Sequence, residues 1–391
     1  MALSDEVALI DAARTPHGSF LGSLTDHSAV DLGAVALEGL FERTDVDPDL
    51  VDWVGLGHAI QAGLGQAPAR QAVLNAGLPK TVPATTINEA SGSGLRAIAL
   101  GADRLVAGSR EFVVAGGMES MSNAPFVLGG MRAGRRYGDA ELVDSMIRDG
   151  LWDLTNDAHM GELTEALVDR VGMSREAQDE YALQSHQRAA AAVERGTFDD
   201  ELVAVPLGHD DVLDRDEGPR ADTTLEGLAK LSPAFAKDGT ITAGNASDLS
   251  DGAGVVLLGS ETATLDAGFD PLAWVVDYHV SYRSPKWFGM AVADAVQGLL
   301  RANGLTVDDV DLFELNEAFA AQMVYVRERL GVPNEKLNVN GGAIALGHPI
   351  GASGGMLTTS LAHAMADRVA TYGVVGMSIG GGGGIAMLLR R

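Results

Sequence analysis

Short apolar runs alternate with longer amphipathic segments along the first 120 residues of the chain. The runs at residues 7–10, 51–57, 85–88 and 112–115 predict strands. Between them, residues 29–41, a segment that begins near residue 67, and residues 92–107 repeat their apolar positions with the period of a helix. Because strands and helices alternate, we predict an α/β fold with a mostly parallel sheet.

The alternation is interrupted once and then returns. Residues 120–239 carry acidic helical patterns near 162–170 and 174–195 and a charged irregular stretch, which predicts an inserted subdomain. Strands are expected again at 255–259, 273–278, 312–315, 373–379 and 385–389, and helices at 291–302, at 318–329 and from Gly355 to Ala366. The turns that begin at Ser91 and Gly351 both lead into a helix and then an apolar strand, which suggests two copies of one α/β unit.

Length and charge narrow the class of protein. The 391 residues correspond to two or three domains of roughly 150 residues. Asp and Glu number 54 against 28 Lys and Arg, a net charge of −26, so neither nucleic acid nor an anionic membrane surface is an expected partner. Only five residues are lysine. Such a surface suits a high-salt solvent, where charge repulsion is screened within about 3 Å at 1 M, and we expect a halophilic, haloarchaeal source.

The absence of cysteine removes disulfides, Cys-ligated metals and thiol nucleophiles together. No apolar run reaches 18 residues, and the first 13 residues lack the pattern of a signal peptide. We expect a soluble, cytoplasmic protein. The sequence contains no phosphate-binding GxxxxGK[ST] loop, and its nine histidines show no metal-ligand spacing, so neither a nucleotide fold nor a metal site is expected.

Four polar residues lie in turns that could carry chemistry. Ser91, in a small-residue turn before a helix, is either a helix N-cap or an exposed nucleophile. His348 lies in a glycine-rich loop, which favours a catalytic role. Asn316 follows a strand and is either an N-cap or a group that orients water or an oxyanion. Ser378 precedes five consecutive glycines, 380–384, that let a ligand approach the backbone closely.

A series of ordered motifs closely resembles the thiolase family, which makes or cleaves β-ketoacyl-CoA. They include Ala13-Arg-Thr-Pro16, Gln61-Ala-Gly-Leu-Gly-Gln66, Gly116-Gly-Met-Glu-Ser-Met-Ser122, His159-Met-Gly161, Gly244-Asn-Ala-Ser247, Asn316-Glu-Ala-Phe319, the His348 loop and the final glycine run. The resemblance implies two βαβαβαββ halves in a five-layered α/β/α/β/α core with an inserted loop domain over the coenzyme A site. It places the N-terminal half at 1–119 plus 240–268, the loop domain at 120–239 and the C-terminal half at 269–391.

The resemblance also implies roles for individual residues. Ser91 and Ser378 occupy the positions of the family's nucleophilic and acid/base cysteines, so both are replaced by serine. His348 matches the activating histidine, and Asn316 matches the asparagine that holds a catalytic water. The residues expected against coenzyme A are His159, Met160, Arg220, Ser247, Ala318 and Phe319, and the amides from Gly380 onward are expected to stabilise the oxyanion.

The two serines change the expected chemistry. A serine needs a base at the moment of attack, which His348 can supply, and a Ser–His pair is ordinary for acyl transfer. Ser378 is a poor proton acceptor, so we hypothesise that His348 or His159 takes the α-carbon proton.

The expected activity is acyl transfer between acetyl-CoA and a short acyl-CoA through acyl-Ser91, with no cofactor beyond these substrates. The alternatives are a non-catalytic CoA-thioester-binding subunit and an acyl-CoA hydrolase. A homodimer or homotetramer is expected from the family, with residues 128–146 resembling its tetramerisation loop, and an additional small OB-fold subunit is a further candidate partner.

Overall fold

A ten-stranded mixed sheet organises the molecule. The computed structural model describes residues 3, 6–44, 46–209 and 211–391. The strand order is β14-β15-β16-β13-β1-β12-β5-β3-β4, and β2 pairs with β12. The strands are β1 (Val7–Arg14), β2 (Gly18–Ser19), β3 (Trp53–Gly57), β4 (Ala84–Ile87), β5 (Phe112–Ser120), β12 (Ser250–Ser260), β13 (Ala273–Tyr282), β14 (Leu312–Leu315), β15 (Tyr372–Ile379) and β16 (Gly383–Arg390).

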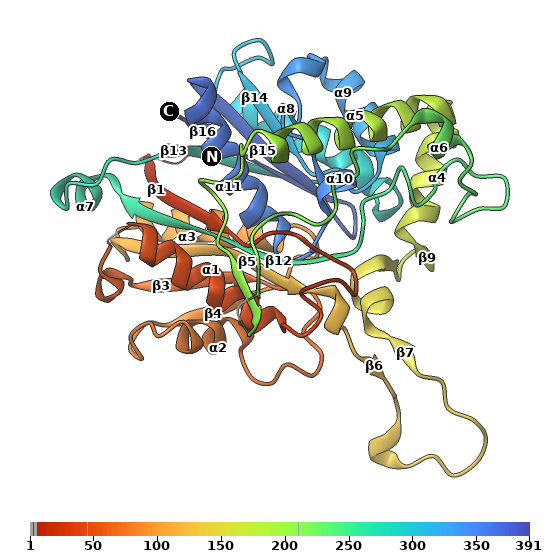
Figure 1. Ribbon diagram of the computed structural model, residues 1–391, viewed down its shortest axis with the longest axis horizontal. Helices are drawn as coiled ribbons and strands as arrows, with labels where there is room; N and C mark the ends of the chain where they lie inside the picture. The colour runs from red at the N-terminus through yellow and green to blue at the C-terminus, as the bar shows by residue number, and fades with distance from the viewer. Residues whose placement is uncertain (1–2, 4–5, 45, 210) are drawn as a thin grey trace.

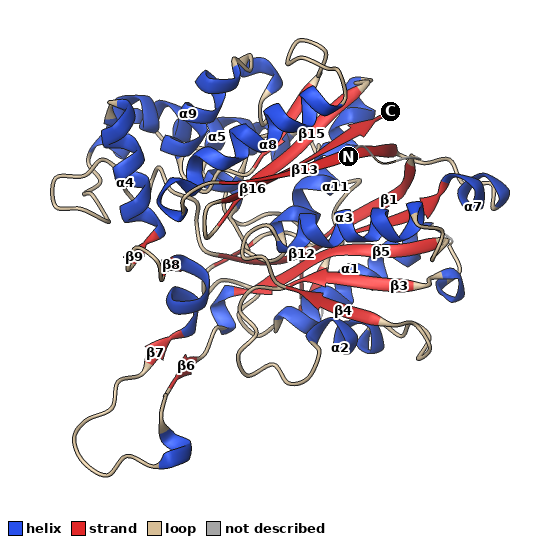
Figure 2. Ribbon diagram, turned by 180° about the vertical axis from the view of Figure 1, so that it is seen from behind, coloured by secondary structure: helices blue, strands red, loops and turns tan. Residues whose placement is uncertain are grey.

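Helices cover both outer faces and fill the space between two half-sheets, which gives the five expected layers (Figures 1 and 2). The outer helices are α1 (Ala29–Thr44) and α2 (Pro68–Asn75) on the first half and α8 (Phe288–Ala302) and α9 (Ala320–Leu330) on the second. The central layer is α3 (Ser93–Val106) and α11 (Ser353–Arg368), whose apolar side chains pack on both half-sheets in one core.

The two halves join at one edge, where Val7–Leu9 of β1 pair antiparallel with Val275–Ala273 of β13. The first half follows the expected order of elements, with parallel pairing of β3 to β4 and to β5. The second half departs from it, because the strand expected before its central helix is only an isolated parallel bridge between Phe313 and Leu337. The remainder of that connection is a loop that contains the short α10 (Ala343–Leu346) and His348.

The central helices meet backbone to backbone at glycines. A Cβ atom on Gly354 would lie 2.0 Å from the Leu95 nitrogen, and one on Gly94 would lie 2.9 Å from the Gly355 nitrogen. Any side chain at these positions would push the helices apart. This contact brings the start of α3, with Ser91, next to the loop before α11, with His348.

The segment between β5 and β12 covers the end of the core where Ser91 and His348 lie. Both predicted acidic helices are present, as α4 (Met160–Val171) and α5 (Arg175–Glu194). The remaining elements are β6 (Phe126–Val127), β7 (Val143–Asp144), β8 (Trp152–Asp153), β9 (Ala158–His159), β10 (Val205–Gly208), β11 (Asp211–Leu213) and α6 (Leu225–Ala229), with α7 (Glu261–Asp266) after β12. The β6–β7 hairpin projects from the body of the molecule (Figure 1). Within the described ranges, no helix has both the length and the apolar composition that a membrane crossing requires.

Candidate active site

Ser91 lies in a tight turn between β4 and α3, with its hydroxyl free to face His348. The preceding Ala90 has φ of 49°, a left-handed conformation that is strained for alanine. Ser93 holds the turn, since its oxygen accepts from the Glu89 N–H at 2.8 Å and its hydroxyl donates to the Ala90 carbonyl at 2.6 Å. The N-cap of α3 is Gly92, so Ser91 is not the capping residue. Instead, Ser91 Oγ lies 3.2 Å from His348 Nε2.

The contacts of the His348 ring determine which nitrogen carries its proton. The Ser353 hydroxyl donates to the Pro349 carbonyl at 2.9 Å, so its oxygen is left to accept from His348 Nδ1, 2.6 Å away. The proton therefore resides on Nδ1, and the Nε2 lone pair faces Ser91. Burial lowers the pKa of His348 to about 4, with His17 acting in the same direction and Glu119 opposing it. The ring is a neutral base placed against a hydroxyl.

Asn316 lies on the other side of Nε2, directly after β14. Its Nδ2 is 3.3 Å from His348 Nε2. The amide oxygen Oδ1 is buried and has no hydrogen-bond partner within the described part of the chain. Helix α9 begins at Ala320 with Phe319 as its N-cap, so Asn316 does not cap a helix.

Ser378 and Gly380 lie at the end of β15, against the Ser91 turn. Ser378 is buried and pairs with Gly384 of β16. A Cβ atom on Gly380 would lie 3.6 Å from the Ala90 Cβ, and one on Gly92 would lie 2.7 Å from the Ile379 side chain. The glycine turn that begins at Gly380 therefore packs on the residues beside Ser91.

His159 is held by the start of α4. Its Nδ1 accepts from the Gly161 N–H at 3.1 Å, and Glu162 accepts from the His159 N–H at 2.7 Å, which completes a capping box. The ring stacks on Phe235, with centroids 4.8 Å apart. Burial lowers the pKa of His159, and Glu162 opposes this shift. His159 thus presents a neutral ring in a wall of aromatic side chains.

Three of the residues expected against coenzyme A share one apolar cluster. Met160 and Phe319 are buried in it, and Ala318 packs at its edge with Phe235. Leu163, Ile241 and Phe288 are the other buried members of the cluster.

The other two expected coenzyme A contacts lie along the segment that precedes β12. The Ser247 N–H donates to the Ala318 carbonyl at 3.0 Å. The next residue, Asp248, accepts from the His348 N–H at 3.0 Å through its carbonyl and from Arg220 at 3.2 Å through its carboxylate. The Arg220 side chain is 63% exposed. One short segment therefore connects the apolar cluster, the loop that contains His348 and a surface guanidinium.

The chain matches two family models in sequence. Residues 7–262 match "Thiolase, N-terminal domain" and residues 269–391 match "Thiolase, C-terminal domain". The chain belongs to the thiolase family.

Thiolases of known name and structure resemble it over their whole length. An acetyl-CoA acetyltransferase of Pseudomonas aeruginosa is 49% identical, with 99% of each chain covered, and one of Escherichia coli is 48% identical over 98% of each. The crystal structure of human mitochondrial 3-ketoacyl-CoA thiolase in complex with CoA superimposes with a TM-score of 0.97 at 42% identity and covers 100% of this chain and 99% of that one. The Bacillus anthracis acetyl-CoA acetyltransferase gives a TM-score of 0.96 at 41% identity and covers 99% and 98%.

Two residues of this thiolase site were missed by the sequence analysis. Ser353 is the first residue of α11, directly after the His348 loop, but nothing in its spacing indicates that it holds the imidazole. Glu119 lies in the Gly116–Ser122 motif, and its buried carboxylate accepts from the Ala59 and Gly351 N–H groups, both at 2.9 Å. It lies 3.1 Å from His58. Glu119 thus connects the loop that contains His348 to the first half of this thiolase.

Proposed function

We propose that this thiolase transfers acetyl groups between coenzyme A thioesters through an acetyl group carried on Ser91. The observation that carries the proposal is the contact of Ser91 Oγ with the unprotonated Nε2 of His348, whose Nδ1 is held by Ser353. A hydroxyl is activated by such a base, as in other Ser–His acyltransferases. The relatives named acetyl-CoA acetyltransferase supply the substrate class.

The first half-reaction forms the oxyester. Ser91 Oγ attacks the thioester carbonyl while its proton moves to His348 Nε2. The carbon–sulfur bond then breaks, and the departing sulfur takes that proton and leaves as free coenzyme A. We assign the oxyanion contact to the Gly380 amide, because the turn it begins packs on the Ser91 turn.

The second half-reaction needs a base for the α-carbon of the incoming thioester. We assign this step to His348, which is neutral again once coenzyme A has left. The Asn316 amide nitrogen, 3.3 Å from His348 Nε2, is placed to donate to the enolate oxygen. Attack of the enolate on the Ser91 ester forms the carbon–carbon bond, and the serine oxygen leaves with the proton from His348. His159 is not assigned as the base, because its Nδ1 already accepts the hydrogen bond that caps α4. Ser378 is not assigned either, because a serine hydroxyl is a weak base at neutral pH.

Substrate binding is proposed for the surface that joins α4, α9 and the 245–248 segment. Met160, Ala318 and Phe319 would line the pantetheine path beside His159, with Ser247 on its wall and Arg220 toward the adenine. The division into two halves (1–119 with 240–268, and 269–391) and a loop domain (120–239) over this path is part of the same proposal.

Intact-protein mass spectrometry tests the acyl-serine. Mixing with acetyl-CoA in molar salt should add one acetyl group at Ser91, and a second thioester should remove it with formation of acetoacetyl-CoA. Ser91→Ala should show no adduct, whereas Ser378→Ala should still be acetylated. An adduct lost to water alone would indicate the hydrolase alternative, and binding of coenzyme A with no adduct would indicate the non-catalytic subunit.

Assembly and location complete the proposal. Exposed apolar side chains on the β6–β7 hairpin support a homotetramer, with a homodimer as its smaller unit, and they leave a small OB-fold subunit as a further candidate partner. The net charge of −26 supports a halophilic, haloarchaeal source and a high-salt cytoplasm. We also propose that Ser91 and Ser378 replace the two catalytic cysteines of the thiolase family.

A further inference from the structure

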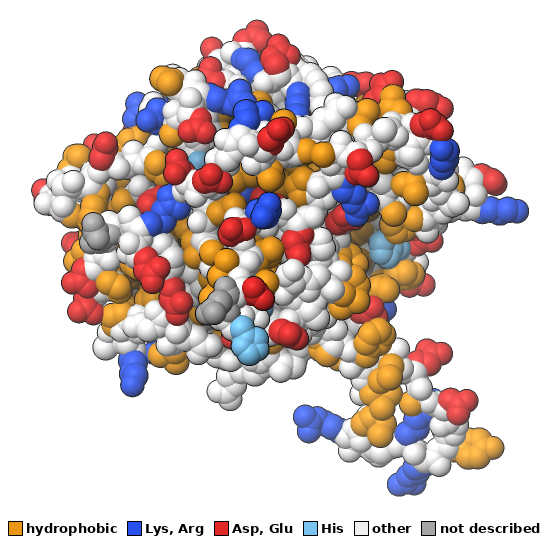
Figure 3. Space-filling view, in the orientation of Figure 1, with side chains coloured by type: hydrophobic (Ala, Val, Ile, Leu, Met, Phe, Trp, Pro, Cys, Tyr) orange, Lys and Arg blue, Asp and Glu red, His pale blue; other side chains and the backbone are white. Residues whose placement is uncertain are grey.

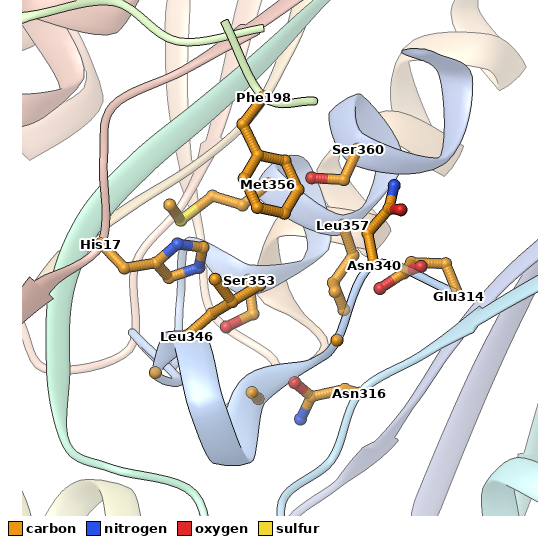
Figure 4. A pocket seen from close by; sticks show the side chains of 13 residues that line it. His17, Phe198, Glu314, Asn316, Asn340, Leu346, Ser353, Met356, Leu357 and Ser360 are labelled. Carbon is orange, nitrogen blue, oxygen red and sulfur yellow. The ribbon is translucent and has the colours of Figure 1, made fainter. Parts of the chain in front are cut away.

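A small buried cavity lies beside Asn316 and Ser353, the two residues that contact the His348 ring together with Ser91 (Figure 4). About 10 Å³ of it is open to the centre of a water molecule, which is close to the space that one water needs. Its walls are formed by His17, Phe198, Glu314, Asn316, Asn340, Gly341, Ala343, Leu346, Gly347, Ser353, Met356, Leu357 and Ser360.

Two polar groups on these walls lack hydrogen-bond partners, and a third forms no ion pair. The side-chain oxygens of Asn316 and Asn340 are buried, and neither accepts a hydrogen bond from any described residue. The Glu314 side chain is also buried, and no ion pair involves it among the described residues. Glu314 and Asn316 are two positions apart at the end of β14, so they face the same side of the sheet, opposite to Phe313 and Leu315 in the core.

The surroundings of Glu314 favour its protonated form. Burial raises its pKa well above the ordinary value, and the carboxylates of Glu317 and Glu201 act in the same direction, against Arg188 and Arg14. Glu317 accepts hydrogen bonds from Tyr181 and Ser185, and Arg14 pairs with Glu201. In its protonated form, Glu314 has one O–H to donate.

We propose that the cavity binds one water molecule, through which Glu314 positions the Asn316 amide. Each of these groups then has a hydrogen-bond partner. The Glu314 O–H donates to the water oxygen, and the water donates its two O–H groups to the side-chain oxygens of Asn316 and Asn340. Holding Oδ1 in this way keeps Asn316 Nδ2 directed at His348 Nε2. The inference rests on the proposed function only for its kinetic consequence, because the water site and the charge state are properties of the resting enzyme.

Infrared difference spectroscopy tests the site without turnover. At pH 7.5, the spectrum of the whole enzyme minus that of Glu314→Gln should show one protonated carboxylic acid C=O band. Asn340→Leu, which removes one acceptor of the water, should shift that band. A carboxylate band in place of the acid band, or an acid band that Asn340→Leu leaves unmoved, would overturn the proposal. If these bands are present but the wild-type protein shows no acetylation of Ser91 by acetyl-CoA, the proposed function is contradicted and the water site is not.

Kinetics separates positioning from mere packing. Glu314→Leu has a similar volume but no donor, and the rate of acetoacetyl-CoA formation at saturating acetyl-CoA, the step in which Asn316 acts, should fall about tenfold with KM changed less than about twofold. Glu314→Gln keeps a neutral donor and should restore the rate to within about threefold of wild type at every pH from 6 to 9.

Thr264→Val is the matched control, since it replaces a buried, unpartnered hydroxyl at α7, distant from the site, and it should leave the rate unchanged. Equal losses in Glu314→Gln and Glu314→Leu, or a wild-type rate in Glu314→Leu, would overturn the positioning role. Should Glu314→Leu not fold, the infrared bands and the rate of Glu314→Gln decide between the two outcomes.

Discussion

At the residue scale, the His348 imidazole is a base whose strength is set by its burial. An ordinary histidine has a pKa of 6.5, and burial lowers that of His348 to about 4. Nε2 therefore stays unprotonated as the pH falls through 6.5, and the site remains competent in weak acid. We expect the rate of Ser91 acetylation, measured by quenched mass spectrometry, to be level from pH 8 to about pH 5 and to fall near pH 4. Circular dichroism at each pH checks that the fold persists, and a loss with a midpoint near pH 6.5 would contradict the assignment.

Which site residues a sequence can indicate depends on whether their chemistry is visible locally. Ser91, His348 and Asn316 lie in glycine-rich or strand-ending turns, and all three were predicted and meet in the structure. Ser91 and His348 are 257 residues apart, however, so only the packing of α3 on α11 shows that they touch. Ser353 and Glu314 escape prediction because a serine at a helix start and a glutamate at a strand end are common, and only burial and proximity give them a role.

At the element scale, the start of α4 decides what His159 can do. Its Nδ1 is the acceptor that caps the helix, so His159→Ala should lower the free energy of unfolding by about 1 kcal/mol. His159→Asn retains a capping acceptor but no base. We expect its stability to match wild type within about 0.5 kcal/mol and its rate at saturating acetyl-CoA to stay within about twofold. Urea unfolding measures the stability, and single-turnover formation of acetoacetyl-CoA measures the rate. A hundredfold rate loss in His159→Asn would indicate that His159, not His348, removes the α-carbon proton.

The β6–β7 hairpin carries several exposed large apolar side chains, and it projects into solvent (Figures 1 and 3). Phe126 and Leu142 are 63% and 64% exposed, more than a monomer needs to leave open. We expect the double variant Phe126→Asp, Leu142→Asp to reduce a tetramer to dimers in light scattering after size exclusion, with Ser91 acetylation retained. Leu154→Asp, at 65% exposure outside the hairpin, is the control. An unchanged mass of the double variant would show that the hairpin does not hold the assembly.

The bounds of helices and strands could be predicted where the apolar positions repeat with one period, and less well where glycines interrupt the apolar run. Residues 312–315 were predicted as a strand and form β14 with the same bounds. Strand β5 was expected to end at Ala115 but continues to Ser120, because Gly116 and Gly117 remain paired with Val255 and Gly254. A Cβ atom on Gly117 would lie 2.1 Å from the Gly351 carbonyl oxygen, so this glycine allows a close approach of the loop that contains His348 and does not form a turn. Such tertiary contacts are invisible to local patterns.

At the scale of the whole molecule, repulsion between the excess acidic side chains lowers the free energy of unfolding. Asp and Glu outnumber Lys and Arg by 54 to 28, and acidic side chains are scattered over the face of the molecule in Figure 3. Like charges repel across several ångströms at low salt, and the Debye length falls from about 10 Å at 0.1 M to about 3 Å at 1 M. Compaction is therefore opposed most strongly in dilute buffer.

We expect the melting temperature to rise by at least about 5 °C between 0.1 M and 2 M KCl, because repulsion is relieved over the whole surface and each kcal/mol of relief moves Tm by about 1 °C in a chain of this size. Differential scanning calorimetry measures the shift. Sucrose at matched water activity is the control, since it strengthens burial by exclusion but screens no charge. Equal shifts in KCl and sucrose would assign the effect to exclusion, and a Tm that falls with KCl would contradict charge repulsion as the force that salt relieves.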